Sequence, residues 1–419
     1  MIKFKKPELL SPIQDYTSLN AAINNGADAV FFGIKGFNMR AGAKNFTVKD
    51  LPKIVKIAHN HKVKTYLAIN TIIYENEIKK VTEILKKVKV AKVDAIICWD
   101  FSIIQIAKKL GIEVHISTQA SIANSETAEF YRKLGVTRVV LARECSLEQI
   151  KEIKKHTKAE IEIFIHGAMC VSMSGRCFMS QFLTGRSANR GECTQPCRRK
   201  YLIKQIDGGK ELELGENYVM SPKDMCTIDF IEKILDVGVD SLKIEGRNRS
   251  PEYVAIVTNA YRKVIDFYYS NKKHDKKFYE EFTKLKCSLS EKLDTVYHRG
   301  KSSGFFLGKP INEWVNGHGS QATQKKAHVG KVLKFYKNIS VAEILVQNNK
   351  IKIGDTIIFQ GPTTGSLEAV IVSLEKDHMP INVAEKGEKI AIKIDSLVRE
   401  NDEVYVMQKV NPKRNLDAR

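Results

Sequence analysis

The first 270 residues alternate between short apolar runs and longer amphipathic segments. The apolar runs are rich in β-branched residues, and the segments between them, such as Val48–His61 and Glu75–Val88, carry apolar residues at helical spacing. Strands that are apolar throughout and separated by helices are typical of a parallel sheet covered on both faces. The expected strands are Pro7–Leu10, Ala29–Gly33, Thr65–Asn70, Ala95–Trp99, Val114–Ser117, Arg138–Ala142, Ile161–His166 and Ser241–Gly246.

Eight such units predict a TIM-like (β/α)8 barrel over residues 1–270. An open, doubly wound sheet is the alternative, but no G-x-G-x-x-G follows the first strand. Between the seventh and eighth strands, residues 167–222 form a long insertion rich in Gly, Ser, Arg and Cys, and its cysteine content argues for a functional role. Within it, Lys200–Val219 is expected to form a hairpin that turns at Asp207–Gly209.

The pattern changes after residue 270. Residues 271–325 form a charged, helical linker, and residues 326–410 consist of short alternating strands with turn signals between them. Such a series predicts a small β-barrel, followed by a basic tail at residues 411–419. We therefore predict an α/β protein in which a parallel barrel with a cysteine-rich insertion precedes a small C-terminal β-barrel.

The barrel prediction places chemistry where strands end, because catalytic groups of (β/α)8 enzymes lie in the loops that follow the strands. Polar residues at these exits are Ser11, Gln14, Arg40, Asn70, Asp100, Thr118, Gln119, Arg143, Glu144, His166, Glu245 and Arg247. Any one of them could be a helix cap or a surface charge, but together they predict a polar, partly cationic mouth. Among them, Arg40, His166, Glu245 and Arg247 are the candidate catalytic residues.

The charge of the 419-residue chain adds a candidate partner. Its formal net charge is +20 and its pI about 9.4, and such an excess of Lys and Arg attracts polyanions such as RNA. A lysine-rich proteome would give the same charge without a nucleic-acid partner. We find no signal peptide and no apolar stretch long enough for a membrane helix, so we expect a cytoplasmic protein with no membrane partner.

In a reducing compartment, clustered cysteines indicate metal or cluster ligation rather than disulfides. Cys98 and Cys145 are expected in the core and Cys287 in the linker, which leaves five others. These are Cys170, Cys177, Cys193, Cys197 and Cys226. Four converging thiolates suit zinc or an iron–sulfur cluster. Only one pair has the tight spacing of a zinc knuckle, and the uneven spacing of the others favours a cubane in the barrel mouth.

Two features beside Cys193 and Cys197 bear on the chemistry. The C-x3-C spacing is that of radical-SAM enzymes, but their third cysteine would fall at Lys200, which excludes that class. The basic run Arg198, Arg199 and Lys200 follows directly and is the candidate contact for a phosphate or carboxylate, because arginine presents a planar fork to such groups. A solvated charge run is the alternative.

Several motifs resemble those of the collagenase-like "unclassified peptidase" family. The signature runs from Glu162 through His166-Gly167-Ala168-Met169-Cys170 to Gly175-Arg176-Cys177-Phe178-Met179-Ser180. Further matches are Glu8–Pro12, Gly26–Val30, Phe37–Arg40, Ser221–Asp224, Lys243–Arg247, Arg299-Gly300 and Gly304–Phe306. The resemblance extends over nearly the whole chain, and the combination is specific.

The resemblance implies an oxygen-independent RNA hydroxylase with a [4Fe–4S] cluster. It is strongest for the enzymes that convert a tRNA wobble uridine to 5-hydroxyuridine, with prephenate as the small-molecule carboxylate that donates the hydroxyl group. Carried over residue by residue, the cluster ligands are Cys170, Cys177, Cys193 and Cys226, with Cys197 as second choice. Hydroxylation of large-subunit ribosomal RNA is an alternative, and whether a partner subunit from the same family is needed stays open.

Two other function classes are retained as alternatives. The family label implies a collagenase-like peptidase, but the sequence has no H-E-x-x-H and no G-x-S-x-G. The other is an RNA-binding assembly factor with structural zinc, which would be colourless where an iron–sulfur protein is brown.

Overall fold

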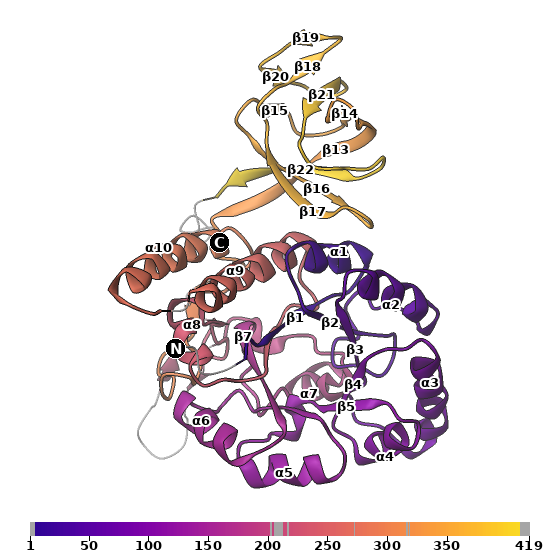
Figure 1. Ribbon diagram of the computed structural model, residues 1–419, viewed down its shortest axis with the longest axis vertical. Helices are drawn as coiled ribbons and strands as arrows, with labels where there is room; N and C mark the ends of the chain where they lie inside the picture. Colours follow the sequence, from indigo (N-terminus) through magenta and orange to yellow (C-terminus); the bar gives the residue numbers. More distant parts are fainter. Residues whose placement is uncertain are drawn as a thin grey trace.

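A computed structural model describes residues 5–201, 203–204, 213–215, 218–271, 273–315, 317 and 319–410. Its centre is a ring of eight parallel strands, in which each strand pairs with the next and the last, β11, pairs with both β7 and β1 (Figure 1). The strands are β1 (Glu8–Pro12), β2 (Ala29–Gly33), β3 (Lys64–Ala68), β4 (Ala95–Cys98), β5 (Glu113–Ile116), β6 (Arg138–Val140), β7 (Glu160–Gly167) and β11 (Ser241–Ile244). The ring confirms the (β/α)8 barrel, and each expected strand is present.

The helices of the barrel surround this ring, and several begin at the capping residues that the sequence supplies. Asp15, Asn124 and Ser146 each accept a hydrogen bond from a backbone N–H of the first turn, which satisfies a donor that the helix leaves unpaired. The helices are α1 (Tyr16–Asn24), α2 (Leu51–Asn60), α3 (Ile78–Val90), α4 (Phe101–Lys109), α5 (Ser125–Lys133), α6 (Leu147–His156), α8 (Ile231–Leu235) and α9 (Pro251–Ser270).

The insertion between β7 and β11 contains α7 (Met179–Thr184), which Figure 1 shows at the middle of the ring. It also contains β10 (Asp224–Cys226), which pairs antiparallel with β7 and parallel with β12 (Lys301–Ser302). The expected hairpin is present as the antiparallel pair β8 (Ile203–Lys204) and β9 (Glu213–Gly215), while its turn lies outside the described residues.

The inside of the ring is filled with side chains, so that only its carboxyl end is open. Glu162 is fully buried there, 2.7 Å from Lys243 Nζ and 3.3 Å from Arg138 Nη1. A buried carboxylate with two cationic partners avoids the cost of an unpaired buried charge. This closed polar layer forms the floor beneath the carboxyl ends of the strands.

The C-terminal region, residues 324–410, is an antiparallel eight-stranded sheet wrapped around its own apolar core. Within the described residues its hydrogen-bonded order runs from β17 to β19, and this wrapped sheet is the separate C-terminal β-structure that the sequence predicts. The strands of this sheet are β13 (Gln324–Tyr336), β14 (Val341–Val346), β16 (Thr356–Gly361), β17 (Gly365–Val370), β18 (Glu375–Lys376), β19 (Met379–Pro380), β21 (Lys389–Lys393) and β22 (Glu403–Lys409). Two further strands, β15 (Ile351–Lys352) and β20 (Val383–Ala384), pair separately with each other. The charged linker contains α10 (Lys276–Leu293), and the basic tail, residues 411–419, lies outside the described residues.

The C-terminal sheet docks on the barrel through α1 and α9 (Figure 1). Asn20 donates to the carbonyl of Pro362 at 2.7 Å, and Glu252 accepts from both Lys326 and Gln360. The contact is so close that a Cβ atom on Gly365 would lie 2.7 Å from the backbone nitrogen of Ala21.

Gly365→Ala is therefore expected to lower the free energy of unfolding by about 1–3 kcal/mol and to loosen the docked sheet, because the new methyl group meets backbone. Gly387→Ala is the matched control, since Gly387 also has a positive φ (+94° against +76°) but nothing within 4 Å of its Cβ position. Thermal unfolding and limited proteolysis of the two variants measure the difference. If both variants lost the same free energy of unfolding, backbone strain rather than the contact between the sheet and the barrel would explain the loss.

Among the described residues, the structure contains no helix with the length and apolar character needed to cross a membrane.

Candidate active site

A cavity of about 430 Å³ opens at the carboxyl ends of the barrel strands. Residues that follow β2, β3, β5, β6, β7 and β11 line it, together with the insertion and the segment after β12. The polar strand-exit residues found in its lining are Arg40, Asn70, Thr118, Gln119, Arg143, Glu144, Glu245 and Arg247. The volume is within the range of small-molecule sites, about 300–1,000 Å³. The mouth is therefore polar and partly cationic, as the sequence predicts.

Four cysteines of the insertion line this cavity: Cys170, Cys177, Cys193 and Cys197. Cys170 follows β7, Cys177 precedes α7, and the other two lie on the loop beyond α7. Burial raises the pKa of the Cys197 thiol, and the neighbouring thiols of Cys170, Cys193 and Cys177 raise it further. Four thiols from three segments of the insertion thus line one cavity.

Close backbone contacts hold these loops in place. Gly191 lies against the loop that carries Arg40, where a Cβ atom would be 2.1 Å from the carbonyl oxygen of Asn38, so only glycine fits. The Gly191 carbonyl accepts from the N–H of Ala41 at 3.0 Å. The backbone N–H of Cys177 donates to Asn189 Oδ1 at 3.1 Å. The cysteine loop and the arginine loop are consequently fixed to one another.

The structure places Cys226, the fourth ligand of the sequence-based set, outside the residues that line the cavity. Cys226 lies on β10 directly opposite His166 of β7, and opposite residues in an antiparallel pair share a face. That face is turned toward α9, where the thiol lies beside the Tyr261 hydroxyl and burial raises its pKa to about 11. Cys197 takes the place beside the other three.

The donor set fits a cluster. Among the described residues, no group of three or more His, Cys, Asp or Glu side chains is arranged to hold a single metal ion. A [4Fe–4S] cluster makes a different demand, because each cysteine binds a separate iron and the thiolates stand around a cube rather than around one point. The thiols of Cys170, Cys177, Cys193 and Cys197 have the type and number required.

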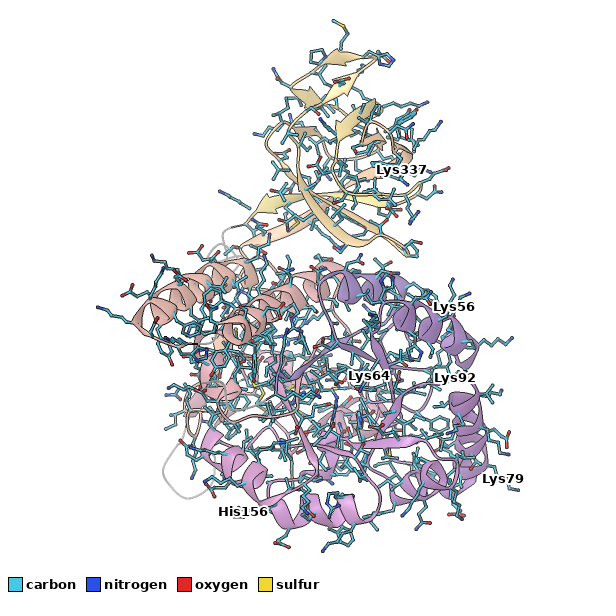
Figure 2. The ribbon with its side chains drawn as sticks, viewed as in Figure 1. Lys56, Lys64, Lys79, Lys92, His156 and Lys337 are labelled. Carbon is cyan, nitrogen blue, oxygen red and sulfur yellow. The ribbon has the colours of Figure 1, made fainter. Side chains whose placement is uncertain are left out.

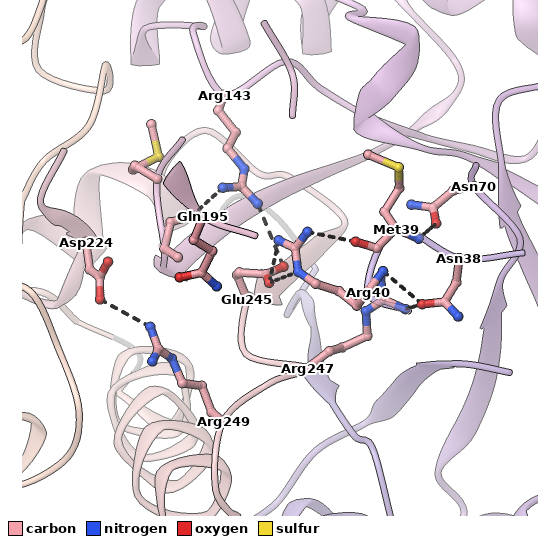
Figure 3. A network of polar contacts seen from close by, with 12 residues as sticks. Asn38, Met39, Arg40, Asn70, Arg143, Gln195, Asp224, Glu245, Arg247 and Arg249 are labelled. Atoms are coloured by element: carbon pink, nitrogen blue, oxygen red, sulfur yellow. Dashed lines mark hydrogen bonds and ion pairs between the residues drawn. The ribbon is translucent and has the colours of Figure 1, made fainter. Parts of the chain in front are cut away.

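Next to the cysteines, three arginines surround Glu245 (Figure 3). Arg40 Nη2 lies 3.0 Å from Glu245 Oε1, and Arg143 Nη2 lies 3.8 Å from Oε2. The guanidinium of Arg143 also covers the ring of Phe164 at 3.9 Å. Arg247 donates to Asn38 Oδ1 at 3.1 Å, while its Nε is buried without a hydrogen-bond partner in the described part of the chain.

The electrostatics of this network leave an excess of positive charge. Burial alone would raise the pKa of Glu245, but Arg40, Arg143 and Arg247 outweigh it and lower that pKa to about 2. Burial and the charge of Arg40 lower the pKa of Arg247 to about 9, against the opposing effect of Glu245. Glu245 lies near all three guanidinium groups, and Glu144 also acts on Arg143. Cations still outnumber these carboxylates, and an anionic ligand would relieve the remaining charge.

Comparison with known proteins identifies the family. Residues 14–316 match Peptidase family U32. The chain belongs to this family. A protein of Porphyromonas gingivalis named "Collagenase" is 40% identical over 96% of this chain and 98% of its own. The "tRNA hydroxylation protein P1" of Bacillus subtilis is 40% identical over 85% of this chain and 84% of its own. The "23S rRNA 5-hydroxycytidine C2501 synthase" of Escherichia coli is 41% identical over 83% of this chain but only 52% of its own.

In this U32 protein, His166 does not take the catalytic position that the sequence predicts. Alternation along β7 points Glu162 and Phe164 into the barrel, and His166 would follow them. However, the pairing of β7 with β11 shifts by one residue between Phe164 and His166, and this bulge turns His166 outward. Its Nδ1 lies 3.3 Å from the Tyr261 hydroxyl, and burial with three nearby cations lowers its pKa to about 3. His166 is a neutral core residue.

The three residues of the basic run after Cys197 have different surroundings: Arg198 is bonded to the protein, and Arg199 and Lys200 are exposed. Arg198 donates to Ser221 Oγ at 2.8 Å, to the carbonyl of Pro222 at 2.7 Å and to the carbonyl of Met169. Its guanidinium therefore ties the cysteine loop to the strand exits and is not free for a ligand. Arg199 and Lys200 are exposed, so the contact predicted for them with a phosphate or carboxylate stays a prediction.

Sequence reasoning placed Arg143 and Asn70 at strand exits without assigning them a role, and the U32 structure puts both on the cavity wall. Asn70 Nδ2 lies 3.2 Å from Gln119 Oε1 and 3.2 Å from Ser117 Oγ. Trp314 and Phe305 also line the cavity, although they belong to the segment that follows β12. Phe305 falls in the family motif Gly304–Phe306, but that motif does not show that the folded chain brings this linker segment to the mouth.

Proposed function

We propose that this U32 protein hydroxylates RNA, and that its substrate is a tRNA wobble uridine converted to 5-hydroxyuridine. The observation that carries the proposal is the joint lining of one cavity by four cysteines and three arginines. Relatives named for tRNA and rRNA hydroxylation, at about the same identity as the collagenase, support it. The tRNA relative matches this chain over a similar share of both lengths, which favours tRNA over ribosomal RNA.

Cys170, Cys177, Cys193 and Cys197 would hold the [4Fe–4S] cluster. When bound there, the cluster would supply redox or Lewis-acid chemistry beside the arginines. Arg40, Arg143 and Arg247 would bind the carboxylates of the hydroxyl donor, for which prephenate is the candidate, and Glu245 would keep their guanidinium groups oriented.

The cavity also offers groups for a base. RNA bases that are modified are turned out of the stack and recognised along their hydrogen-bonding edges. The amides of Asn70 and Gln119 can donate to and accept from the edge of a pyrimidine. Phe305 and Trp314 on the opposite segment provide apolar surface that would exclude water.

Deletion of the gene is expected to remove 5-hydroxyuridine and its derivatives from total tRNA, as measured by mass spectrometry of nucleosides. Restoring the wild-type gene should restore the modification, and 5-hydroxycytidine in ribosomal RNA should stay unchanged. Loss of 5-hydroxycytidine instead would select the ribosomal alternative. If both nucleosides persist in a strain with no second family member, RNA hydroxylation is not the function.

The peptidase alternative has the support of the collagenase relative's name. A cysteine peptidase needs a base beside its thiol. The cavity lining, as far as the structure describes it, contains no histidine, and His166 faces Tyr261. Collagen cleavage that persists after iron is removed but disappears in Cys170→Ala would favour the peptidase.

A further inference from the structure

A second cavity, of about 580 Å³, lies on the outer wall of the barrel between α2 and α3. Its charged lining consists of five lysines and a single carboxylate, that of Glu83. The lysines are Lys49, Lys56, Lys86, Lys87 and Lys92. We call this surface the α2–α3 groove. No residue of the active-site cavity takes part in it.

The positive charge of the groove is largely uncompensated. Glu83 is paired with Lys86, at 2.7 Å from its Nζ. Among the described residues, the other four lysines have no ion-pair partner, and all four are exposed. Placing like charges together destabilises a fold through repulsion, so the groove is suited to an anionic partner. The favourable interaction of lysines with a helix C-terminus accounts for Lys87 but not for Lys49 or Lys56.

An apolar floor strengthens the field of these lysines. Val48, Pro52, Val55, Val90 and Ala91 line the groove between them, and Val90 is 82% exposed. A cleft with charges of one sign and a wall of low dielectric constant concentrates the potential and raises the local concentration of counter-ions. The groove is therefore a polyanion site by charge and by shape.

The position of the groove connects it to the mouth of the barrel. Val48 and Lys49 stand at the end of the loop that follows β2, and the same loop carries Arg40 of the active-site cavity. From there the groove continues along α2 and α3, where Figure 2 shows Lys56 and Lys92 on the outer wall. An anionic chain with one end at the cavity could follow this wall.

We propose that the α2–α3 groove binds the phosphate backbone of the RNA whose target base enters the cavity. This inference rests on the proposed function. Lysine is suited to the task, because its ammonium group contacts phosphate as a point charge without reading the base sequence. The groove would set the orientation of the RNA, and the cavity would select the base.

The test is a variant with Lys49, Lys56, Lys87 and Lys92 all replaced by alanine, in the full-length, cluster-loaded protein. Its matched control replaces four exposed lysines on the α8–α10 side of the barrel, none of which has an ion-pair partner in the part of the chain that the structure describes: Lys233, Lys273, Lys276 and Lys284. Both variants lose the same net charge, so any difference between their affinities for tRNA reflects where the lysines lie on the surface. Fluorescence anisotropy with labelled full-length tRNA at several salt concentrations gives the affinity and its salt dependence.

The groove variant is expected to bind tRNA on the order of tenfold more weakly, with the slope of log affinity against log salt reduced by about 3. Hydroxylation should show a raised KM with kcat unchanged, as expected when binding alone is lost. Equal affinities of the two variants would overturn the groove even if the wild type hydroxylates tRNA. A groove-dependent affinity without hydroxylation would instead uphold the groove and overturn the proposed function.

Discussion

Cys197→Ser is expected to abolish iron binding and RNA hydroxylation, whereas Cys226→Ser is expected to keep both. Cys197 lines the cavity with Cys170, Cys177 and Cys193, while Cys226 lies behind the barrel wall beside Tyr261. A serine hydroxyl is a poor replacement for a thiolate, so loss of one of four ligands should leave the cluster labile. Iron analysis and the visible absorbance of protein purified without oxygen measure the outcome, with roughly four irons per chain expected for the wild type.

Two controls make this comparison decisive. Cys226 is buried, so Cys226→Ala should be included and circular dichroism should establish that each variant is folded. Cys287→Ser removes an exposed thiol of α10, away from the mouth, and should behave as the wild type. A folded Cys226 variant without iron, or a Cys197→Ser protein with a full complement of iron, would contradict the proposed ligand set.

The barrel could be predicted from the sequence because its signal is repeated and local. The strands are buried along most of their length, as Ala29–Gly33 is throughout, and they alternate with helices that have one apolar face, such as α2. The exits of these strands then follow from the topology alone, which is why Arg40, Glu245 and Arg247 could be placed in the mouth before any geometry was known.

His166 and Cys226 both lie outside the residues that line the cavity, and the pairing of β7 accounts for the orientation of both. A single bulge in β7 reverses the inward alternation at His166, and Cys226 pairs with His166 and so follows it outward. The carbonyl of Ile165, at the bulge, accepts hydrogen bonds from Tyr261 and Thr227, both at 3.0 Å, which stabilises the irregular strand. A pattern of period two cannot reveal a one-residue insertion whose support comes from a distant helix.

The strand order of the C-terminal sheet and its docking on the barrel could not be predicted from the sequence. Alternating strands predict a curved antiparallel sheet, but closure depends on which strands become neighbours. Here β17 and β19 are the two edges of the sheet, and β17 packs against α1 and α9. An edge strand covered by another domain is protected from further pairing, so closure is not required.

Glu245→Gln is expected to lower the free energy of unfolding by about 3–5 kcal/mol near neutral pH. It should also reduce hydroxylation, because the arginines that would bind the donor lose the carboxylate that orients them. Glu245 is 11% exposed and is the carboxylate that balances Arg40, Arg143 and Arg247. Removing it leaves three buried cations without their partner. Thermal and denaturant unfolding measure the stability, and the matched control is Glu232→Gln, which breaks the ion pair with Lys286 far from the cavity.

The pH dependence gives a second readout of the same network. The pKa of Glu245 in the folded protein is about 2, below its ordinary value of 4.5, so its contribution to stability is present above pH 4.5 and is lost as the pH falls toward 2. The shift corresponds to roughly 3 kcal/mol. The wild type should therefore lose more stability than Glu245→Gln between about pH 5 and pH 2. Parallel pH profiles would show that this carboxylate is not stabilised by the arginines.

An added dicarboxylate tests whether the three arginines bind a carboxylate ligand or only stabilise the fold. In Glu245→Gln the freed guanidinium groups should accept malonate, so malonate should raise the Tm of this variant more than that of the wild type. Glu232→Gln should show no such response, because the residues around Glu232 do not line the cavity. If malonate stabilised neither the wild type nor Glu245→Gln, the three arginines would not form a carboxylate site, and the assignment of the donor to this wall of the cavity would be wrong. The malonate experiment therefore tests binding of the hydroxyl donor by the arginines, and its outcome does not depend on which cysteines hold the cluster.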